Sequence, residues 1–264
     1  MKVGIAGVGT VGGALKTFFQ HCMKKEESFW KTSVESQFWN NFELLLHDPD
    51  KGYNNEKYIK ECDYVFICVP VLTDNSNRLQ RTENIVSILK LMQPGATAVI
   101  RSTVLPCTTD LLNGVHSANV IHMPEFLTES RALNDIFALD VICGGEDDPN
   151  IRMMFPGKKH VFTSNIEAEL CKYMHNCLGA VKVTYANVFY DLCKRYGANY
   201  DIVKRLINIT GFFSPMHLDV PGHHGLGYSG KCFPENMESL SLITDSELIH
   251  GAIKDNNKFR AMSK

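Results

Sequence analysis

The sequence GVGTVG, residues 7–12, decides the fold of the first half of the chain. It follows the short apolar run KVGIA, which predicts a buried strand, and it opens a segment with the apolar spacing of a helix. A GxGxxG sequence between a strand and a helix is the turn that binds the pyrophosphate of a dinucleotide. Gly7 allows the tight turn, Gly9 lets the backbone approach the phosphates, and Gly12 lets the helix pack close to the strand.

The free N–H groups at the start of that helix favour the charge of a phosphate. The alternative is a glycine-rich turn without a ligand. We expect the cofactor to contact five residues of this turn, namely Gly7, Gly9, Thr10, Val11 and Gly12.

An acidic residue is expected at the end of the second strand, where it holds the ribose hydroxyls. FELLLH (residues 42–47) has the composition of a strand, and Asp48 follows it. The interval is longer than the usual distance of about 20 residues because EESFWKTSVESQFWNNF, which we interpret as an extended helix or a loop, is interposed. Asp50 is the alternative, as is an ordinary turn. An acid in place of an arginine favours NAD over NADP.

Apolar runs alternate with helical patterns through the rest of this half: YVFICV before Pro70, then ATAVIRST, VIHMPEFLTES and DVICGG. This alternation predicts an α/β fold with a Rossmann-like, doubly wound parallel sheet. Ligands of such sheets lie at the carboxyl ends of the strands. We therefore expect Val69, Pro70, Thr103 and Glu125 near one crevice. Among them, Val69, Pro70 and Thr103 are expected to contact the cofactor.

The second half has helical patterns only. Apolar residues recur at intervals of three and four from about residue 166 to 196, which predicts one long central helix. A further helix is expected at 201–210, and a last helical segment from about Pro234. We expect a dinucleotide-binding domain at 1–160 and an all-helical domain at 161–264.

Lys172 and Asn176 are four residues apart, so both project from one face of the long helix. An ammonium and an amide together can hold an oxyanion. A solvated lysine beside a surface asparagine is the alternative.

The sequence GYSGKCFPEN, residues 227–236, surrounds one cysteine with unusual neighbours. Pro234 suits the first turn of a helix, so Cys232 is expected just before a helix N-terminus and beside Lys231. Both features favour the thiolate, and the preceding glycines keep it accessible. Cys232 is therefore a candidate nucleophile.

Composition excludes several classes of partner. The chain of 264 residues has a formal net charge of −2, which argues against nucleic acid or an anionic membrane as the main partner. No apolar run reaches the length of a membrane span, and the N-terminus reads as a strand rather than a secretion signal. The nine cysteines are scattered through apolar segments, which is typical of reduced, cytoplasmic proteins. No Cys/His pattern predicts a metal, and His223-His224 is an isolated pair.

The segments GVGTVG, CVPVLT, RSTVLP, MPEFLTES, EAELCKYMHN and GYSGKCFPEN resemble, in the same order, those of the UDP-glucose/GDP-mannose dehydrogenases. Their joint occurrence covers nearly the whole chain and is far more specific than a glycine motif. The resemblance implies two successive NAD-dependent oxidations of a sugar C6 alcohol, through a thiohemiacetal and a thioester. UDP-glucose is the best candidate substrate, and GDP-mannose and other hexose nucleotides stay open.

The resemblance also implies a role for each matching residue. Cys232 would be the nucleophile, Lys172 and Asn176 would hold the oxyanion, and Glu129 and Thr103 would hold and activate water. Asn236 would stand among the catalytic residues. The sugar would be bound by Glu125, Phe126, Leu127, Tyr228 and Gly230, together with Lys172 and Asn176.

Two departures from the family stand out. Glu235 and Asn236 occupy positions where the family usually has lysine and aspartate, and an amide cannot accept a proton. The family also carries a further nucleotide-binding domain without a counterpart in these residues, so we expect weak UDP-glucose binding or a nucleotide domain from another chain.

The alternatives are a β-hydroxyacid dehydrogenase, which needs no cysteine, and an NAD-binding pseudoenzyme or partner subunit. The helix at 166–196 has more apolar positions than a small helical domain buries, and the resemblance places such a helix in a dimer core. We therefore expect a homodimer.

Overall fold

A computed structural model gives the structure of residues 1–25, 30, 32–54, 56–74, 76, 79–212 and 214–263. The chain forms two compact units. The first comprises residues 1–72 and 80–172, and the second comprises residues 73–79 and 173–264. The expected domain limit at 160/161 remains a prediction.

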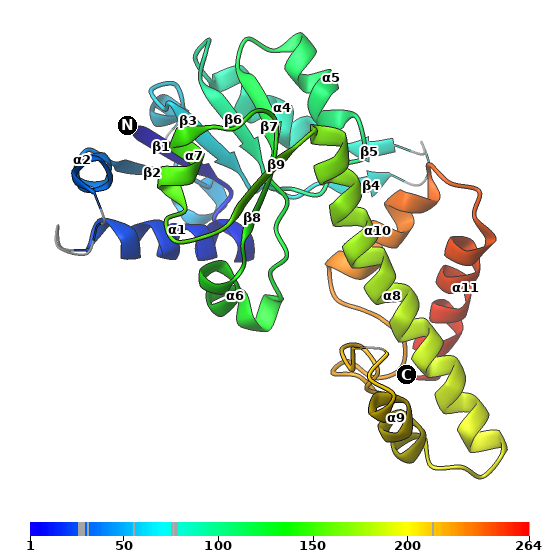
Figure 1. The fold of residues 1–264 in the computed structure, drawn as a ribbon. Helices are drawn as coiled ribbons and strands as arrows, with labels where there is room; N and C mark the ends of the chain where they lie inside the picture. Colours follow the sequence, from blue (N-terminus) through cyan, green and yellow to red (C-terminus); the bar gives the residue numbers. More distant parts are fainter. Residues whose placement is uncertain are drawn as a thin grey trace. The chain divides into compact units, whose positions relative to one another are not determined.

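A five-stranded parallel sheet forms the centre of the first unit (Figure 1). The strand order is β2-β1-β3-β6-β7, so the chain leaves β1 toward one edge and later returns to pair on the other side of β1. This reversal confirms the doubly wound, Rossmann-like prediction. The strands are β1 (Lys2–Ala6), β2 (Glu43–His47), β3 (Tyr64–Ile67), β6 (Thr97–Ile100) and β7 (Asn119–His122).

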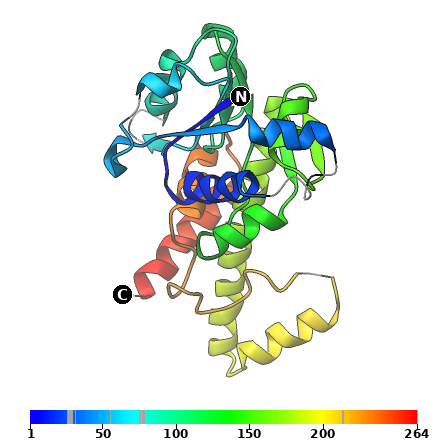
Figure 2. The same cartoon turned by 90° about the vertical axis from the view of Figure 1, so that its left-hand side faces the viewer.

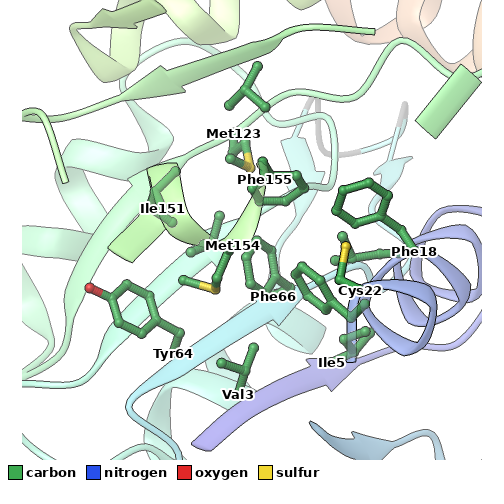
Figure 3. Close-up of a cluster of buried hydrophobic side chains, with 14 of the residues drawn as sticks. Val3, Ile5, Phe18, Cys22, Tyr64, Phe66, Met123, Ile151, Met154 and Phe155 are labelled. Atoms are coloured by element: carbon green, nitrogen blue, oxygen red, sulfur yellow. The ribbon is translucent and has the colours of Figure 1, made fainter. Parts of the chain in front are cut away.

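Both faces of the sheet are buried. Successive residues of each strand point to opposite sides, and helices cover each side. One apolar cluster joins the sheet to α1, α6 and α7, and the other joins it to α3, α4 and α5. In the first cluster the ring of Phe155 stacks on Phe18 and meets Phe66 edge-on (Figure 3). The helices are α1 (Thr10–Met23), α3 (Glu56–Ile59), α4 (Glu83–Leu91), α5 (Thr108–Val115), α6 (Ala132–Ala138) and α7 (Pro149–Met154).

Two short sheets accompany the central one. β4 (Leu72–Asp74) pairs with β5 (Leu79–Arg81), and β8 (Val141–Gly144) pairs in parallel with β9 (His160–Thr163). The segment DVICGG was expected to close the main series of strands, which is wrong. It forms β8 in a separate sheet, because its hydrogen-bonded partner is β9, a strand that lacks a clear sequence signal.

The interposed segment before β2 contains helix α2 (Ser33–Asn40). Thr32 and Glu35 form a capping box at its start, and Trp39 stacks on Trp30. Residues 26–29 and 31 of this segment lie outside the described residues. The part that is described agrees with the helical interpretation.

In its described residues, the second unit receives contributions from four helices. The long helix α8 (Asn165–Arg195) confirms the prediction, and α9 (Tyr200–Ile209), α10 (Cys232–Ser241) and α11 (Glu247–Met262) follow. Helices α10 and α11 lie side by side in both views (Figures 1 and 2). A small core joins α8 to α9 and includes Tyr200, whose hydroxyl donates to the Leu218 carbonyl at 2.8 Å. Within the described residues, the helices are too short or too polar for a membrane span.

Candidate active site

The glycine turn has the geometry that a dinucleotide requires. Gly7 has a φ of 86°, and a Cβ atom there would lie 2.8 Å from the Cys68 carbonyl oxygen. A Cβ at Gly12 would lie 1.9 Å from the Gly7 carbonyl oxygen, whereas a Cβ at Gly9 would meet no atom within 4 Å. Helix α1 begins directly afterwards, at Thr10. A tight turn, an accessible backbone and a helix N-terminus together fit the pyrophosphate of NAD.

Asp48 lies against this turn, as the motif requires. Its Oδ2 atom accepts a hydrogen bond from the Val8 N–H at 2.6 Å, so the end of β2 is fixed beside the end of β1. Lys51 Nζ donates to the Val8 carbonyl from the short 3₁₀ helix Pro49–Lys51. Lys51 gives no signal in the sequence, because only the turn between β2 and α3 brings it back to the glycines.

Hydrogen bonds hold the segment that carries Thr103 against its neighbours. Ser102 Oγ donates to the Val69 carbonyl at 2.6 Å. The side-chain amide of Gln80 donates to the Thr103 carbonyl at 3.3 Å and accepts from the Leu105 N–H at 2.8 Å. The structure thus places Val69 close to Ser102, at the carboxyl ends of neighbouring strands. Gln80 was missed, because nothing in the local sequence links it to Thr103.

Pro70 follows Val69 and contacts a helix. Its carbonyl accepts a hydrogen bond from Asn84 Nδ2, on α4, at 3.1 Å. The predicted cofactor contacts of Val69, Pro70 and Thr103 remain predictions.

Lys172 is buried and forms an ion pair inside the first unit. Its Nζ atom lies 2.9 Å from Glu125 Oε1, and it also donates to the Glu125 backbone carbonyl. The two side chains are 3% and 8% exposed, which excludes the solvated-lysine alternative. The other carboxylate oxygen of Glu125 accepts from the Leu127 N–H at 2.7 Å. The Lys172 ammonium lies 5.3 Å from the centre of the Phe126 ring.

This arrangement brings Lys172, Glu125, Phe126 and Leu127 together, as expected for residues of one site. Removal of one partner from such a buried pair costs about 3–5 kcal/mol, because the other charge stays buried. Glu129 differs from them, since it is exposed at the start of the 3₁₀ helix Glu129–Arg131.

The second unit brings Asn176 and Asn236 together. Asn176 Nδ2, on α8, donates to Asn236 Oδ1, on α10, at 2.5 Å. Asn176 Oδ1 lies 3.0 Å from the Nδ1 atom of His175. Asn176 and Asn236 are 5% and 3% exposed, so this amide pair is part of the interior and not a surface feature.

Cys232 is the first residue of α10 and is exposed. Lys231 occupies the N-cap position, so the helix begins at Cys232 itself and not directly after it, as was expected. Pro234 lies in the first turn, as predicted. A helix N-terminus and a neighbouring cation both favour a thiolate. Burial, in contrast, raises the pKa of Cys177, on α8, to about 12, which keeps that sulfur protonated.

The loop before Cys232 is held by two buried asparagines. Asn187 Oδ1, on α8, accepts from the Gly227 N–H at 3.0 Å, and Asn256 Oδ1, on α11, accepts from the Tyr228 N–H at 2.6 Å. Tyr228 is buried, whereas Gly230 is exposed and has a φ of 81°. Asn187 and Asn256 were missed, because helix-interior asparagines give no signal without knowledge of the packing.

Glu235 has a partner of its own. Its Oε1 atom accepts from the Thr73 hydroxyl at 2.5 Å, and the same hydroxyl lies 2.7 Å from Ser239 Oγ. Glu235, at a position where the family usually has lysine, therefore links Thr73 to α10 through a hydrogen bond.

Comparison with known proteins agrees with this geometry. Residues 51–158 match the model of the NAD binding domain of the UDP-glucose/GDP-mannose dehydrogenase family, and residues 166–257 match its central domain. The chain belongs to the UDP-glucose/GDP-mannose dehydrogenase family. It therefore carries the NAD-binding domain of this dehydrogenase family, and NAD is its cofactor.

Individual members of the UDP-glucose/GDP-mannose dehydrogenase family are moderately similar. UDP-glucose 6-dehydrogenase YwqF of Bacillus subtilis is 30% identical over 78% of this chain and 51% of its own length. UDP-glucose 6-dehydrogenase of Rickettsia bellii is 26% identical over 97% of this chain and 66% of its own length. The chain thus spans between half and two thirds of these relatives.

A solved structure shares the fold. UDP-D-ManNAc dehydrogenase from Pyrococcus horikoshii superposes with a TM-score of 0.74 at 20% identity, over 99% of this chain and 69% of that one. At this identity the likeness shows the fold alone. Within the described residues, we find no group of three His, Cys, Asp or Glu side chains suited to a metal ion.

Proposed function

We propose that the chain oxidises the C6 alcohol of a nucleotide sugar, UDP-glucose, to the uronate in two NAD-dependent steps. The observation that carries this proposal is the position of Cys232, exposed at the first residue of α10. The membership of the family and the NAD-binding domain support it.

NAD supplies the hydride acceptor for both oxidations. Between them, the Cys232 thiolate attacks the C6 aldehyde carbon, which gives a thiohemiacetal with a new C–S bond. Oxidation of this adduct gives a thioester. Water then attacks the thioester carbon, the C–S bond breaks, and the carboxylate and the thiolate are released.

Lys172 and Asn176 are proposed to hold the oxygen of these adducts. An ammonium has three N–H donors, of which Glu125 takes two in the structure. An amide has two, of which Asn236 takes one. One donor of each side chain can therefore serve an oxyanion.

The water-activating role belongs to Thr103 and Glu129 in this proposal. Thr103 is half-buried on a segment held by Gln80, which supports a fixed position. Glu129 is exposed, which suits a group that exchanges protons with solvent. Sugar binding is assigned in this proposal to Glu125, Phe126, Leu127, Tyr228 and Gly230.

We propose a homodimer through α8. Apolar side chains at intervals of three and four form a stripe on this helix, and several are largely exposed, including Met174 (74%), Leu178 (62%) and Tyr185 (58%). The stripe continues through Phe189. A second copy of the same helix would cover such a stripe symmetrically. A cytoplasmic location is proposed from the many thiols, such as Cys62 and Cys143, that are buried without a disulfide.

The test is NADH formation by the wild type and by Cys232→Ala with three substrates: UDP-glucose, GDP-mannose and a small β-hydroxyacid. The proposal predicts NADH from UDP-glucose and loss of complete oxidation in the variant. Activity on the β-hydroxyacid that survives Cys232→Ala would establish the other dehydrogenase class. NAD binding without turnover of any substrate would establish a binding protein.

A further inference from the structure

The first two turns of α8 carry a stripe of buried polar side chains. Asn165, Glu169 and Lys172 follow one another at intervals of four and three residues, so they share one face of the helix. Their exposed fractions are 8%, 0% and 3%. A carboxylate without solvent contact needs strong partners, because its burial is otherwise costly.

Glu169 finds these partners at the start of α5. Its Oε2 accepts from the Cys107 N–H at 2.8 Å, and its Oε1 accepts from the Thr109 N–H at 2.9 Å and the Thr109 hydroxyl at 2.6 Å. A helix N-terminus is ordinarily capped by the side chain that precedes it. Here the cap comes from a helix some 60 residues further along the chain.

The backbone conformation of Cys107 also indicates that the chain directly before α5 is constrained. This residue has a φ of 74°, in the left-handed region, which is unfavourable for a residue with a Cβ atom. Such a conformation persists only where the surroundings maintain it. Glu169 holds the N–H of this same residue.

Asn165 and Lys172, the neighbours of Glu169 on this buried polar face, show which parts of the first unit are joined here. One turn earlier, Asn165 accepts from the His122 N–H at 2.9 Å and donates to Asp110, on α5, at 2.8 Å. One turn later, Lys172 binds Glu125. Glu169 therefore joins the helix that carries Lys172 to the segment that runs from Thr103 to α5, and Asn165 adds a second contact further along, at Asp110.

We infer that Glu169 is a positioning residue that fixes the Thr103 segment relative to Lys172. The inference rests on the proposed function, in which Lys172 holds the oxyanion and Thr103 helps to activate water. Gln80 holds the beginning of the segment, at Thr103 and Leu105, and Glu169 holds its end, at Cys107 and Thr109.

The test compares Glu169→Gln with Glu167→Gln. The first change keeps the size of the side chain but replaces one acceptor oxygen by an N–H donor, which faces the donors of α5. The control changes a glutamate of the same helix turn, whose partners are Thr163, at the end of β9, and Ser164, directly before α8. Hydrogen exchange and steady-state kinetics are measured for both.

In Glu169→Gln, we expect amide exchange at Cys107 and Thr109 to accelerate about tenfold or more, with a smaller acceleration at Leu105. We expect kcat per folded enzyme to fall about 10- to 100-fold, while KM for NAD changes less than about twofold. Thr109→Val should add little to the loss in Glu169→Gln, because both changes break the same contact. Glu167→Gln should retain the exchange at Leu105 and kcat.

The outcomes separate the two claims. Faster exchange at Cys107 and Thr109 with unchanged exchange at Leu105 and unchanged kcat would overturn the inference and leave a helix cap. A wild type without turnover would contradict the proposed function. In that case, amide exchange at Leu105 in Glu169→Gln would still show whether Glu169 holds the Thr103 segment, because this measurement needs no substrate.

Discussion

The ring of Phe233 lies so close to Gly179 that a Cβ atom at position 179 would stand 2.6 Å from the ring. Gly179 is in α8, and Phe233 follows Cys232 at the start of α10. The two helices can therefore approach this closely only because Gly179 has no side chain. The same contact determines where the backbone next to the sulfur lies.

Gly179→Ala tests this contact. The added methyl group must displace Phe233, and overpacking of this kind costs about 1–3 kcal/mol of unfolding free energy. We expect a lower midpoint in urea and a lower kcat, because Cys232 moves with its neighbour. Gly251→Ala, in α11, is the control, since a Cβ there meets no atom within 4 Å. Equal effects of both changes would contradict the packing argument.

Asn236→Asp tests the effect of the amide at this position. Its Oδ1 already accepts from Asn176, so an aspartate keeps that hydrogen bond and adds a proton acceptor. General-base catalysis contributes about 10²–10⁴-fold, and part of this should appear as faster thioester hydrolysis in Asn236→Asp. Intact-protein mass spectrometry during turnover measures the share of Cys232 present as an adduct. An unchanged share and rate would show that Asn236 does not limit hydrolysis.

Leu178→Asp tests the dimer. Leu178 is 62% exposed on the α8 stripe, and loss of a buried leucine costs about 1.5–3 kcal/mol per copy in addition to the charge it introduces. We expect monomers by light scattering at micromolar protein. Leu111→Asp, at a 69% exposed position of α5, is the matched control and should remain dimeric. A monomeric wild type would contradict the proposal.

His122 should make the protein sensitive to acid. Both ring nitrogens are buried and have no hydrogen-bond partner among the described residues. Burial, with Arg101 and Lys172 nearby, lowers the pKa of His122 to about 3. The unfolded state takes up a proton near pH 6.5 and the folded state does not, so stability falls as pH falls from about 6.5 toward 3.

This difference corresponds to about 2 kcal/mol between pH 7.5 and pH 5. His122→Phe removes the titrating group from an apolar site and should lose that much less stability on acidification. Urea unfolding at the two pH values measures the difference. The same loss in the wild type and the variant would show that His122 does not titrate in this way.

The sequence predicted the elements with strong periodicity and the sites with strong motifs. The glycine turn, Asp48 beside it, and the long helix lie where expected, because each rests on local chemistry that packing does not override. Strand β9 and the separate β8–β9 sheet were not predicted. Short strands such as His160–Thr163 depend on a partner strand, which a local pattern does not reveal.

The buried polar partners of the site were also missed. Gln80, Glu169, Asn187 and Asn256 are ordinary helix, strand or loop residues in the sequence. Their importance appears only when the fold brings them to backbone groups tens of residues away. The spacing of Lys172 and Asn176 predicted a shared helix face, but their burial, and the pairing of Lys172 with Glu125, needed the structure.

The most direct test of the central claim is the number of NADH molecules formed per UDP-glucose when the sugar nucleotide is limiting. Two NADH per UDP-glucose in the wild type, and a loss of this yield in Cys232→Ala, are the predicted results. One NADH per sugar would show that oxidation stops at the aldehyde or its adduct. The same yield of two in Cys232→Ala would contradict the role of the cysteine.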